Sequence, residues 1–353
     1  MIRAVVVGYG LAGRVFHAPL IARQDRIELR GFVARSPEAR AEAIARWPGT
    51  IGYANIDEAL ADPAVDLVAI ATPHDTHADL CIRALEARKH CVVDKVMALN
   101  EAQADAMIAA RDASGRMLSV FHNRRWDWDY LTLRRALDEG RLGPIFWAES
   151  AVVRHAPPRT WRGDRRSAGG LLHDWGAHLI DQALQLGLGP CRRLSAWLTP
   201  ALDDWQGVDT DSHGVIVMEF DSARFQIVNS RACRLDRPRW WVLGRDGCYL
   251  QNGIDPQETA LRAGDLAGAI QPPEHRAICK TSEGEETLDR APGGWDAYYA
   301  NIAAHLLDGE PLAVTAEQGR EVVRVLDAAE LSGRERATIG GPWGESRGSA
   351  GWP

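Results

Sequence analysis

The sequence predicts an α/β domain with a parallel sheet, followed by an α+β domain with a large, mostly antiparallel open sheet. Three observations predict this arrangement. Strand-like and helix-like segments alternate up to residue 121, a glycine-rich turn joins the first strand to the first helix, and strand-like segments follow one another directly in the second half. Alternating strands and helices form parallel sheets, whereas successive strands joined by tight turns form antiparallel or mixed sheets. The length of 353 residues also favours two domains.

The first domain is expected to cover residues 1–121. Short apolar runs rich in β-branched residues predict buried parallel strands at residues 3–8, 27–34, 65–71, 90–94 and 117–121. Helices are expected between them at residues 13–23, 37–47, 77–88 and 101–113. Ser36 stands at the N-cap position of the second helix and Pro37 at its first position, where proline is well tolerated.

The second domain is expected to cover residues 122–339. Its predicted helices lie at residues 128–139, 174–186, 256–263, 295–307 and 315–332. Its predicted strands lie at residues 144–153, 193–199, 212–220, 223–233, 239–244 and 248–251. Residues 340–353 are rich in Gly, Ser and Trp without periodicity, which predicts a flexible tail.

The composition excludes several classes of protein. A net charge of -7 argues against a nucleic-acid partner, which would face a basic surface. No apolar run approaches the roughly 18 residues of a membrane span, and the first residues lack the features of a signal peptide. The six cysteines are scattered without a Cys-x-x-Cys pair, so we expect no metal site and reduced thiols in a cytoplasmic protein.

A glycine-rich turn at residues 8–13 fits the pattern G-x-G-x-x-G. Gly8 permits the tight turn, Gly10 lets the backbone approach a pyrophosphate, and Gly13 lets helix and strand pack closely. The alternative is an ordinary glycine-rich loop. A strand before the turn and a helix after it favour a Rossmann dinucleotide-binding domain. The predicted phosphate contacts are Gly8, Gly10, Leu11, Ala12 and Gly13.

The end of the second strand predicts which dinucleotide binds. A carboxylate there would bind both ribose hydroxyls of NAD. Glu28 lies about 20 residues after Gly8, but it stands at the beginning of that strand. Arg35 and Ser36 stand at its end, where they can bind a 2′-phosphate, so NADP is predicted and NAD stays possible. The alternative for Arg35 is a solvated surface charge.

Three residues have side chains suited to hydride-transfer chemistry. Lys95 follows a strand at the carboxyl edge of the parallel sheet, where ligands bind, and could stabilise a developing alkoxide. Asp174 and His178 are four residues apart and share one helix face. His178 is a candidate proton carrier. The alternatives are a surface lysine paired with Asp94, an acidic residue at a helix N-terminus and a core histidine.

Several segments, in this order, resemble the glucose–fructose oxidoreductase / inositol dehydrogenase / rhizopine-catabolism (Gfo/Idh/MocA) family. Residues 72–77 resemble T-P-N-x-x-H, residues 91–96 resemble V-V-x-E-K-P, and residues 122–127 resemble the N-R-R segment. Residues 169–182 resemble G-G-x-x-x-D-x-G-x-H-x-x-D-Q. The resemblance extends to about residue 335, and residues 13–21 and 253–258 are similar to a branch that includes NADP-dependent scyllo-inositol dehydrogenases.

The resemblance implies roles for these residues in an oxidoreductase that acts on a sugar, cyclitol or related polyol. The family's catalytic lysine, aspartate and histidine match Lys95, Asp174 and His178. The implied further cofactor contacts are Thr72, Pro73, His74, His77, Asp94 and Lys95. The implied substrate contacts are Lys95, Asn123, Arg124, Trp161, Arg162, Asp174 and His178. The second domain is often an oligomer contact in this family, so a homodimer or homotetramer is expected.

Departures from the family pattern and a basic loop leave the substrate open. Asp94 replaces the usual glutamate, Val96 the usual proline, and His74 the usual asparagine. The loop at residues 154–166 contains several arginines, which suit a carboxylate or phosphate on the substrate; a subunit contact or a solvated loop is the alternative.

Two other functions are considered: a glycoside-cleaving enzyme that uses tightly bound NAD for transient oxidation, and a non-catalytic dinucleotide or sugar sensor.

Overall fold

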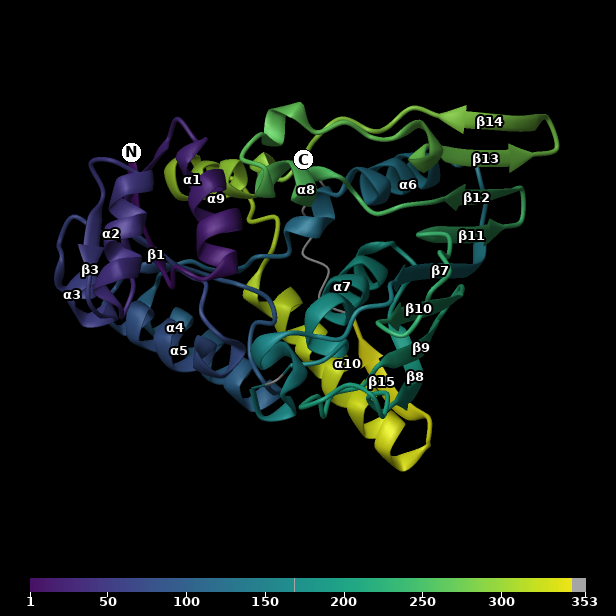
Figure 1. Cartoon of the computed structure of the whole chain (residues 1–353). Coiled ribbons are helices and arrows are strands. Elements are labelled where there is room, and N and C mark those ends of the chain that lie inside the picture. Colours follow the sequence, from purple (N-terminus) through teal and green to yellow (C-terminus); the bar gives the residue numbers. More distant parts are fainter. Residues whose placement is uncertain (168, 345–353) are drawn as a thin grey trace.

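The computed structural model describes residues 1–167 and 169–344, which form two sheets and the helices around them (Figure 1). The first sheet has six parallel strands in the order β3-β2-β1-β4-β5-β6. Its strands are β1 (Ile2–Val7), β2 (Ile27–Val33), β3 (Ile51–Tyr53), β4 (Leu67–Ile70), β5 (His90–Val93) and β6 (Leu118–Val120). The strand order reverses beside β1, which is the position where dinucleotides bind in such sheets.

Helices cover both faces of this first sheet. Figure 1 shows α4 and α5 on one side of it and α1 on the other. The helices are α1 (Ala18–Ala22), α2 (Pro37–Arg46), α3 (Ile56–Ala61), α4 (His77–Glu86) and α5 (Glu101–Ser114), and a π-helical turn, Ala12–His17, leads into α1. Side chains of Ser36, Asn55 and Asn100 cap α2, α3 and α5 by accepting a hydrogen bond from a backbone N–H three residues ahead.

The second sheet has nine strands in the order β14-β13-β12-β11-β7-β10-β9-β8-β15. Neighbouring strands in this sheet run antiparallel, except β7 and β10, which run parallel to each other. The strands are β7 (Ile145–Val153), β8 (Cys191–Thr199), β9 (His213–Phe220), β10 (Arg224–Ser230), β11 (Trp240–Gly244), β12 (Gly247–Gln251), β13 (Ala277–Thr281), β14 (Gly284–Leu288) and β15 (Ile339–Trp343). The predicted fold class, a Rossmann domain followed by a mostly antiparallel open sheet, is confirmed.

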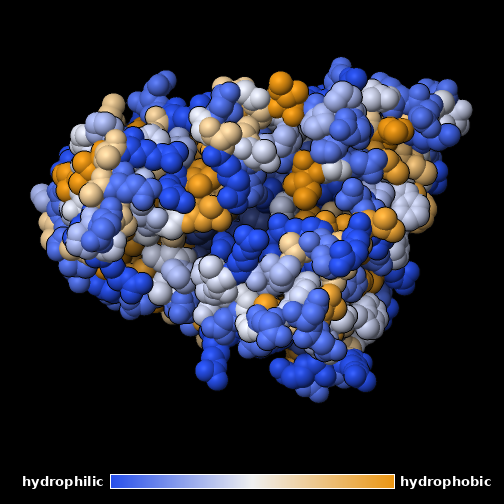
Figure 2. Space-filling model, viewed as in Figure 1, coloured by the Kyte–Doolittle hydropathy of each residue, from blue (hydrophilic) through white to orange (hydrophobic). Residues whose placement is uncertain are grey.

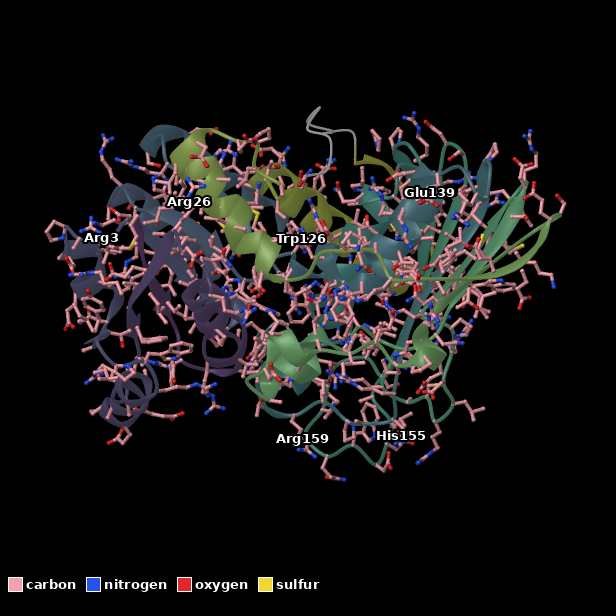
Figure 3. All side chains as sticks on the ribbon, turned by 90° about the horizontal axis from the view of Figure 1, so that it is seen from above. Arg3, Arg26, Trp126, Glu139, His155 and Arg159 are labelled. Carbon is pink, nitrogen blue, oxygen red and sulfur yellow. The ribbon has the colours of Figure 1, made fainter. Side chains whose placement is uncertain are left out.

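One helix of the second half, α10 (Ala316–Glu335), contacts both sheets. Other helices of this half are α6 (Trp128–Asp138), α7 (Ala177–Gln185), α8 (Gln257–Arg262) and α9 (Asp296–Asp308). α10 packs against β8 of the second sheet and also against α5 and β6 of the first. α9 packs beside α1, and Figure 3 shows Arg26 close to α9. The guanidinium of Arg26 donates to both carboxylate oxygens of Asp308, the last residue of α9, at 2.6 and 2.7 Å. None of the helices in the described ranges is long and apolar enough to cross a membrane.

The prediction of a flexible tail from residue 340 is wrong for residues 340–343. These residues belong to β15, which pairs with β8 at one edge of the second sheet. Trp343 anchors the strand because its side chain is only 4% exposed. A Gly-Gly-Pro sequence has low strand propensity, so the tertiary pairing decides the structure here. Residues 345–353 of the predicted tail lie outside the described residues.

Candidate active site

A cleft of about 1900 Å³ lies between the carboxyl edge of the first sheet and the second half of the chain. Figure 2 shows it as a hollow near the centre of the molecule, with hydrophilic side chains along much of its rim. Residues from both halves line it. They include Gly8, Gly10, Leu11, Ala12, Arg35, Ser36, Thr72, Pro73, His74, Asp94, Lys95, Asn123, Arg124, Trp161, Arg162, Asp174 and His178.

The glycine-rich turn has the geometry that a pyrophosphate needs. Gly8 has a φ of +100°, and a Cβ there would lie 2.7 Å from the Ala71 carbonyl oxygen. A Cβ on Gly13 would lie 1.9 Å from the Gly8 carbonyl oxygen, so only glycine permits this close packing. Around Gly10 a Cβ would meet nothing within 4 Å, so this backbone is open to the cleft. The chain therefore fits a dinucleotide at this turn.

The carboxyl end of β2 presents one cationic side chain, that of Arg35, to the cleft and no carboxylate between residues 33 and 36. Arg35 and Ser36 are exposed there, and the Ser36 hydroxyl oxygen accepts a hydrogen bond from the Ala39 N–H. Arg40 of α2, which the sequence reasoning missed, donates to the carbonyl oxygens of Ala34 and Arg35 at 2.7 and 2.9 Å. Arg40 therefore fixes the backbone that carries Arg35.

The segment after β4 brings Thr72, Pro73 and His74 to the cleft, but His77 lies behind them. His77 is fully buried, and its ring nitrogens are 2.7 Å from the Val96 carbonyl oxygen and 3.0 Å from the Thr72 carbonyl oxygen. The expectation of a direct cofactor contact for His77 is therefore wrong on geometry. Burial lowers the pKa of His77, so its neutral ring has one N–H, which can donate to one of these two carbonyl oxygens.

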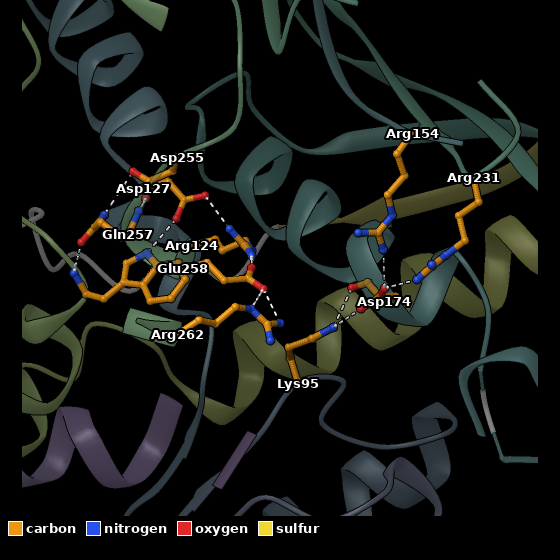
Figure 4. A network of polar contacts seen from close by, with 11 residues as sticks. Lys95, Arg124, Asp127, Arg154, Asp174, Arg231, Asp255, Gln257, Glu258 and Arg262 are labelled. Carbon is orange, nitrogen blue, oxygen red and sulfur yellow. Dashed lines mark hydrogen bonds and ion pairs between the residues drawn. The ribbon is translucent and has the colours of Figure 1, made fainter. Parts of the chain in front are cut away.

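Lys95 follows β5 and reaches the helix that carries Asp174 (Figure 4). The Lys95 ammonium donates to the Asp174 carbonyl oxygen at 2.8 Å and to its carboxylate Oδ1 at 3.3 Å. The alternative, an ion pair between the Lys95 ammonium and Asp94, is not what the structure shows. The Asp94 carboxylate instead accepts a hydrogen bond from the Lys95 backbone N–H at 2.8 Å. Burial opposes the charge of Asp94, but neighbouring His17 and Lys95 outweigh it and lower the pKa of Asp94 to about 2.

Asp174 and His178 both line the cleft, as their predicted spacing on one helix face requires. A π-helical turn, Leu172–Gly176, carries Asp174 and leads directly into α7, which carries His178. Burial, followed by the positive charges of Lys95 and Arg124, lowers the pKa of His178 well below its ordinary 6.5. The imidazole is therefore neutral at pH 7, and its buried Nδ1 has no hydrogen-bond partner among the described residues.

Cations surround Asp174 and keep it ionised. The Arg231 guanidinium lies 2.8 Å from its Oδ2 and the Arg154 guanidinium lies 3.9 Å from the same atom. Burial opposes ionisation, but Lys95, Arg231, Arg162 and Arg154 outweigh it and lower the pKa of Asp174. A carboxylate in this setting stays charged and can still accept a hydrogen bond from a sugar hydroxyl, because its oxygens have further lone pairs.

The predicted substrate contacts from the second half differ in how many of their side-chain groups are already bound to other residues. Asn123 is buried at the cleft wall. Arg124 also lines the cleft, but its guanidinium pairs with Asp127 and Glu258 and lies 3.8 Å from the ring centroid of Trp175. Trp161 packs edge-on against His74 of the first domain, with ring centroids 4.8 Å apart, so these two rings meet across the cleft.

Sequence reasoning missed Arg231 as a residue of the cleft. Arg231 is the first residue after β10, and it lies 57 positions after Asp174 in the sequence. It belongs to no recognisable motif, so only the strand order of the second sheet brings it to the cleft. Within the described residues, no cluster of three or more His, Cys, Asp or Glu residues could hold a metal ion.

The fold and the cleft together define a two-domain oxidoreductase with a dinucleotide-binding domain. Residues 2–122 match the family model described as the oxidoreductase family with an NAD-binding Rossmann fold. Residues 130–250 match the GFO/IDH/MocA C-terminal domain. The chain belongs to the Gfo/Idh/MocA family, and the resemblance found in the sequence is confirmed.

Similar proteins match along nearly the whole chain. The chain is 32% identical over 349 residues to scyllo-inositol 2-dehydrogenase (NADP(+)) IolW of Bacillus subtilis (strain 168), covering 96% of this chain and 95% of that protein. It is 35% identical over 352 residues to the uncharacterized oxidoreductase YdgJ of Escherichia coli (strain K12), covering 96% and 98%. The solved structure of the putative oxidoreductase yvaA from Bacillus subtilis has a TM-score of 0.89 at 30% identity, covering 96% and 98%.

Proposed function

We propose that this chain is an NADP-dependent oxidoreductase that interconverts a secondary alcohol and a ketone on a sugar, cyclitol or related polyol. The observation that carries the proposal is that Lys95, Asp174 and His178 line the same cleft as the glycine-rich turn. Similarity to a relative named scyllo-inositol 2-dehydrogenase (NADP(+)) supports both the cofactor and the substrate class.

The proposed mechanism assigns one role to each of the three residues. When bound, a nicotinamide supplies the acceptor or donor for the hydride of the carbinol carbon. Neutral His178 takes the hydroxyl proton during oxidation and returns it during reduction. Lys95 donates a hydrogen bond to the same oxygen and favours its alkoxide character. Asp174 holds the Lys95 ammonium in place and accepts a hydrogen bond from a neighbouring hydroxyl.

The test follows the absorbance of the reduced cofactor with purified protein. NADP and NAD are each offered with inositols, aldoses and sugar acids, and NADPH is offered with keto sugars. We expect turnover with NADP that is lost in Lys95→Ala. A cofactor that co-purifies and shows no net reduction would instead support the glycoside-cleaving alternative. Tight NADPH binding without turnover of any substrate would contradict the proposed reaction.

The preference for NADP is tested at Arg35. Arg35→Ala is expected to weaken binding of NADPH by about tenfold or more, since a charge-assisted hydrogen bond to the 2′-phosphate is lost. Binding of NADH, which has no such phosphate, is expected to change little. Titration of tryptophan fluorescence with each cofactor measures both constants.

Arg46→Ala is the matched control for Arg35→Ala. Arg46 is an exposed arginine at the other end of α2 and is not part of the cleft wall. This control should bind NADPH like the unchanged protein. Equal losses for NADPH and NADH in Arg35→Ala would contradict an NADP-specific role for Arg35.

The pH dependence of oxidation tests the role of His178. The neutral imidazole accepts the proton, so the rate falls only when His178 becomes protonated as the pH decreases through its pKa. Because that pKa lies well below 6.5, kcat for oxidation is expected to stay constant between about pH 8 and pH 6.5. A decline in kcat with a midpoint above pH 6.5 would contradict this assignment.

A further inference from the structure

Strand pairing in the second sheet places two arginines side by side at the cleft. β7 and β10 are parallel neighbours, and Val153 at the end of β7 pairs with Ser230 at the end of β10. Arg154 and Arg231 are the next residues along each strand, and the Arg154 N–H donates to the Ser230 carbonyl oxygen at 2.9 Å. The carboxyl ends of parallel strands meet at one edge of a sheet, so both side chains extend from the same edge toward Asp174 (Figure 4).

A third arginine, Arg162, reaches the cleft from the short turn Thr160–Gly163. This turn is held against the segment before Asp174, because the Gly170 N–H donates to the Arg162 carbonyl oxygen at 2.9 Å. A Cβ on Gly169 would lie only 2.5 Å from that same oxygen. The close backbone approach fixes where the turn sits, while the Arg162 guanidinium lies 4.7 Å from the ring centroid of Trp161.

The charges at this end of the cleft do not balance. Four cationic side chains, those of Lys95, Arg154, Arg162 and Arg231, line it and lower the pKa of Asp174, and Lys95 also lowers the pKa of Asp94. In residues 1–167 and 169–344, the ion pairs of Lys95, Arg154 and Arg231 all go to Asp174, and Arg162 has none. Four positive charges less the two negative charges of Asp174 and Asp94 leave two positive charges uncompensated.

The imbalance is most costly at Arg231, which is 7% exposed. Burial, together with the charges of Arg154 and Arg162, lowers the pKa of Arg231 despite its contact with Asp174. A buried cation is normally paired with an anion, because water no longer screens its charge. Arg231 shares the Asp174 carboxylate with Lys95 and Arg154, so a second anion in the cleft would complete the pairing.

We propose that the substrate carries an oxyanion, a carboxylate or a phosphoryl group, that binds Arg154, Arg162 and Arg231 while its carbinol carbon lies at Lys95 and His178. This inference rests on the proposed function and narrows its substrate class from polyols in general to acidic sugars or cyclitols. Guanidinium forks suit both kinds of oxyanion, since each accepts two parallel N–H hydrogen bonds.

The first experiment measures binding rather than turnover. Isothermal titration calorimetry with NADPH-saturated protein, in which an alcohol has no hydride acceptor, compares gluconate, glucuronate and glucose 6-phosphate with glucose. At least one acid is expected to bind more tightly than glucose by about tenfold or more, the scale of one charged hydrogen bond. Preference for the carboxylates or for the phosphate identifies the oxyanion. If none of the three acids binds more tightly than glucose, the proposal is overturned.

Two variants test the assigned residues. Arg154→Gln and Arg162→Gln are each expected to reduce the preference for the acid over glucose by about tenfold. The Arg154 side chain is 48% exposed, so its replacement should not disturb folding. Arg245→Gln is the matched control, because Arg245 is 74% exposed on the turn between β11 and β12. An unchanged preference in both cleft variants overturns the proposal.

Turnover separates failure of this inference from failure of the proposed function. If neutral polyols are oxidised with NADP but no acid binds preferentially, only the acidic-substrate inference fails. If acids bind through Arg154 and Arg162 but no polyol or acid is turned over with either dinucleotide, the oxyanion site stands and the proposed reaction fails.

Discussion

His178→Asn is expected to lower kcat for the best substrate by about 10²- to 10⁴-fold, the contribution of a positioned general acid or base. Asparagine can still form hydrogen bonds, but it cannot take up the hydroxyl proton. NADPH binding is expected to change little, because His178 lies on α7 of the second half, whereas the glycine-rich turn and Arg35 belong to the first domain. Steady-state kinetics and a fluorescence titration with NADPH measure the two quantities separately.

His213→Asn is the control for this substitution. His213 is the first residue of β9, is only partly buried and does not line the cleft. The control should retain kcat within a fewfold of the unchanged protein. Full activity in His178→Asn would remove His178 from the mechanism, whereas loss of NADPH binding together with activity would indicate a structural role.

The parts of the site that the sequence predicted depend on local patterns. The turn at residues 8–13 is recognisable because the strand before it and the helix after it are its nearest neighbours in the sequence. The ends of β2 and β5 are set by apolar runs, which places Arg35 and Lys95 at the carboxyl edge of the sheet. The spacing of Asp174 and His178 places both on one helix face.

The parts that the sequence did not predict depend on contacts between distant residues. Arg231 reaches Asp174 only because β10 lies parallel to β7, and no local pattern specifies that pairing. β3 (Ile51–Tyr53) is too short to show alternation, and β15 forms from a Gly-Gly-Pro segment only beside β8. His77 matched a cofactor-binding segment, but its ring turns inward to two backbone carbonyls, which a motif cannot reveal.

Asp181→Asn is expected to reduce the free energy of unfolding by about 3–5 kcal/mol, because it leaves a buried cation without its anion. Asp181 lies on α7, and both of its carboxylate oxygens accept from Arg125 at 2.6 and 2.8 Å. The two side chains are 1% and 2% exposed. Arg125 also donates to the Ala313 carbonyl oxygen and the Gln318 side chain, so it links α7 to the start of α10.

The Asp308→Asn variant provides a matched control with the same pairing geometry at the surface. Asp308 also accepts two hydrogen bonds from one arginine, Arg26, but the two side chains are 47% and 45% exposed. Water and salt screen such pairs, so this substitution should change the free energy of unfolding much less than Asp181→Asn does. Urea denaturation followed by tryptophan fluorescence measures both variants.

Activity adds a second measurement for Asp181→Asn. His178 stands three residues before Asp181 on α7, so the ion pair anchors the helix face that positions the imidazole. We therefore expect Asp181→Asn to have a lower kcat than the unchanged protein even at urea concentrations at which the variant is still folded. Asp308→Asn is expected to keep its kcat until it unfolds. An equally small loss of stability in both variants would mean that the buried pair stabilises α7 no more than a surface pair does.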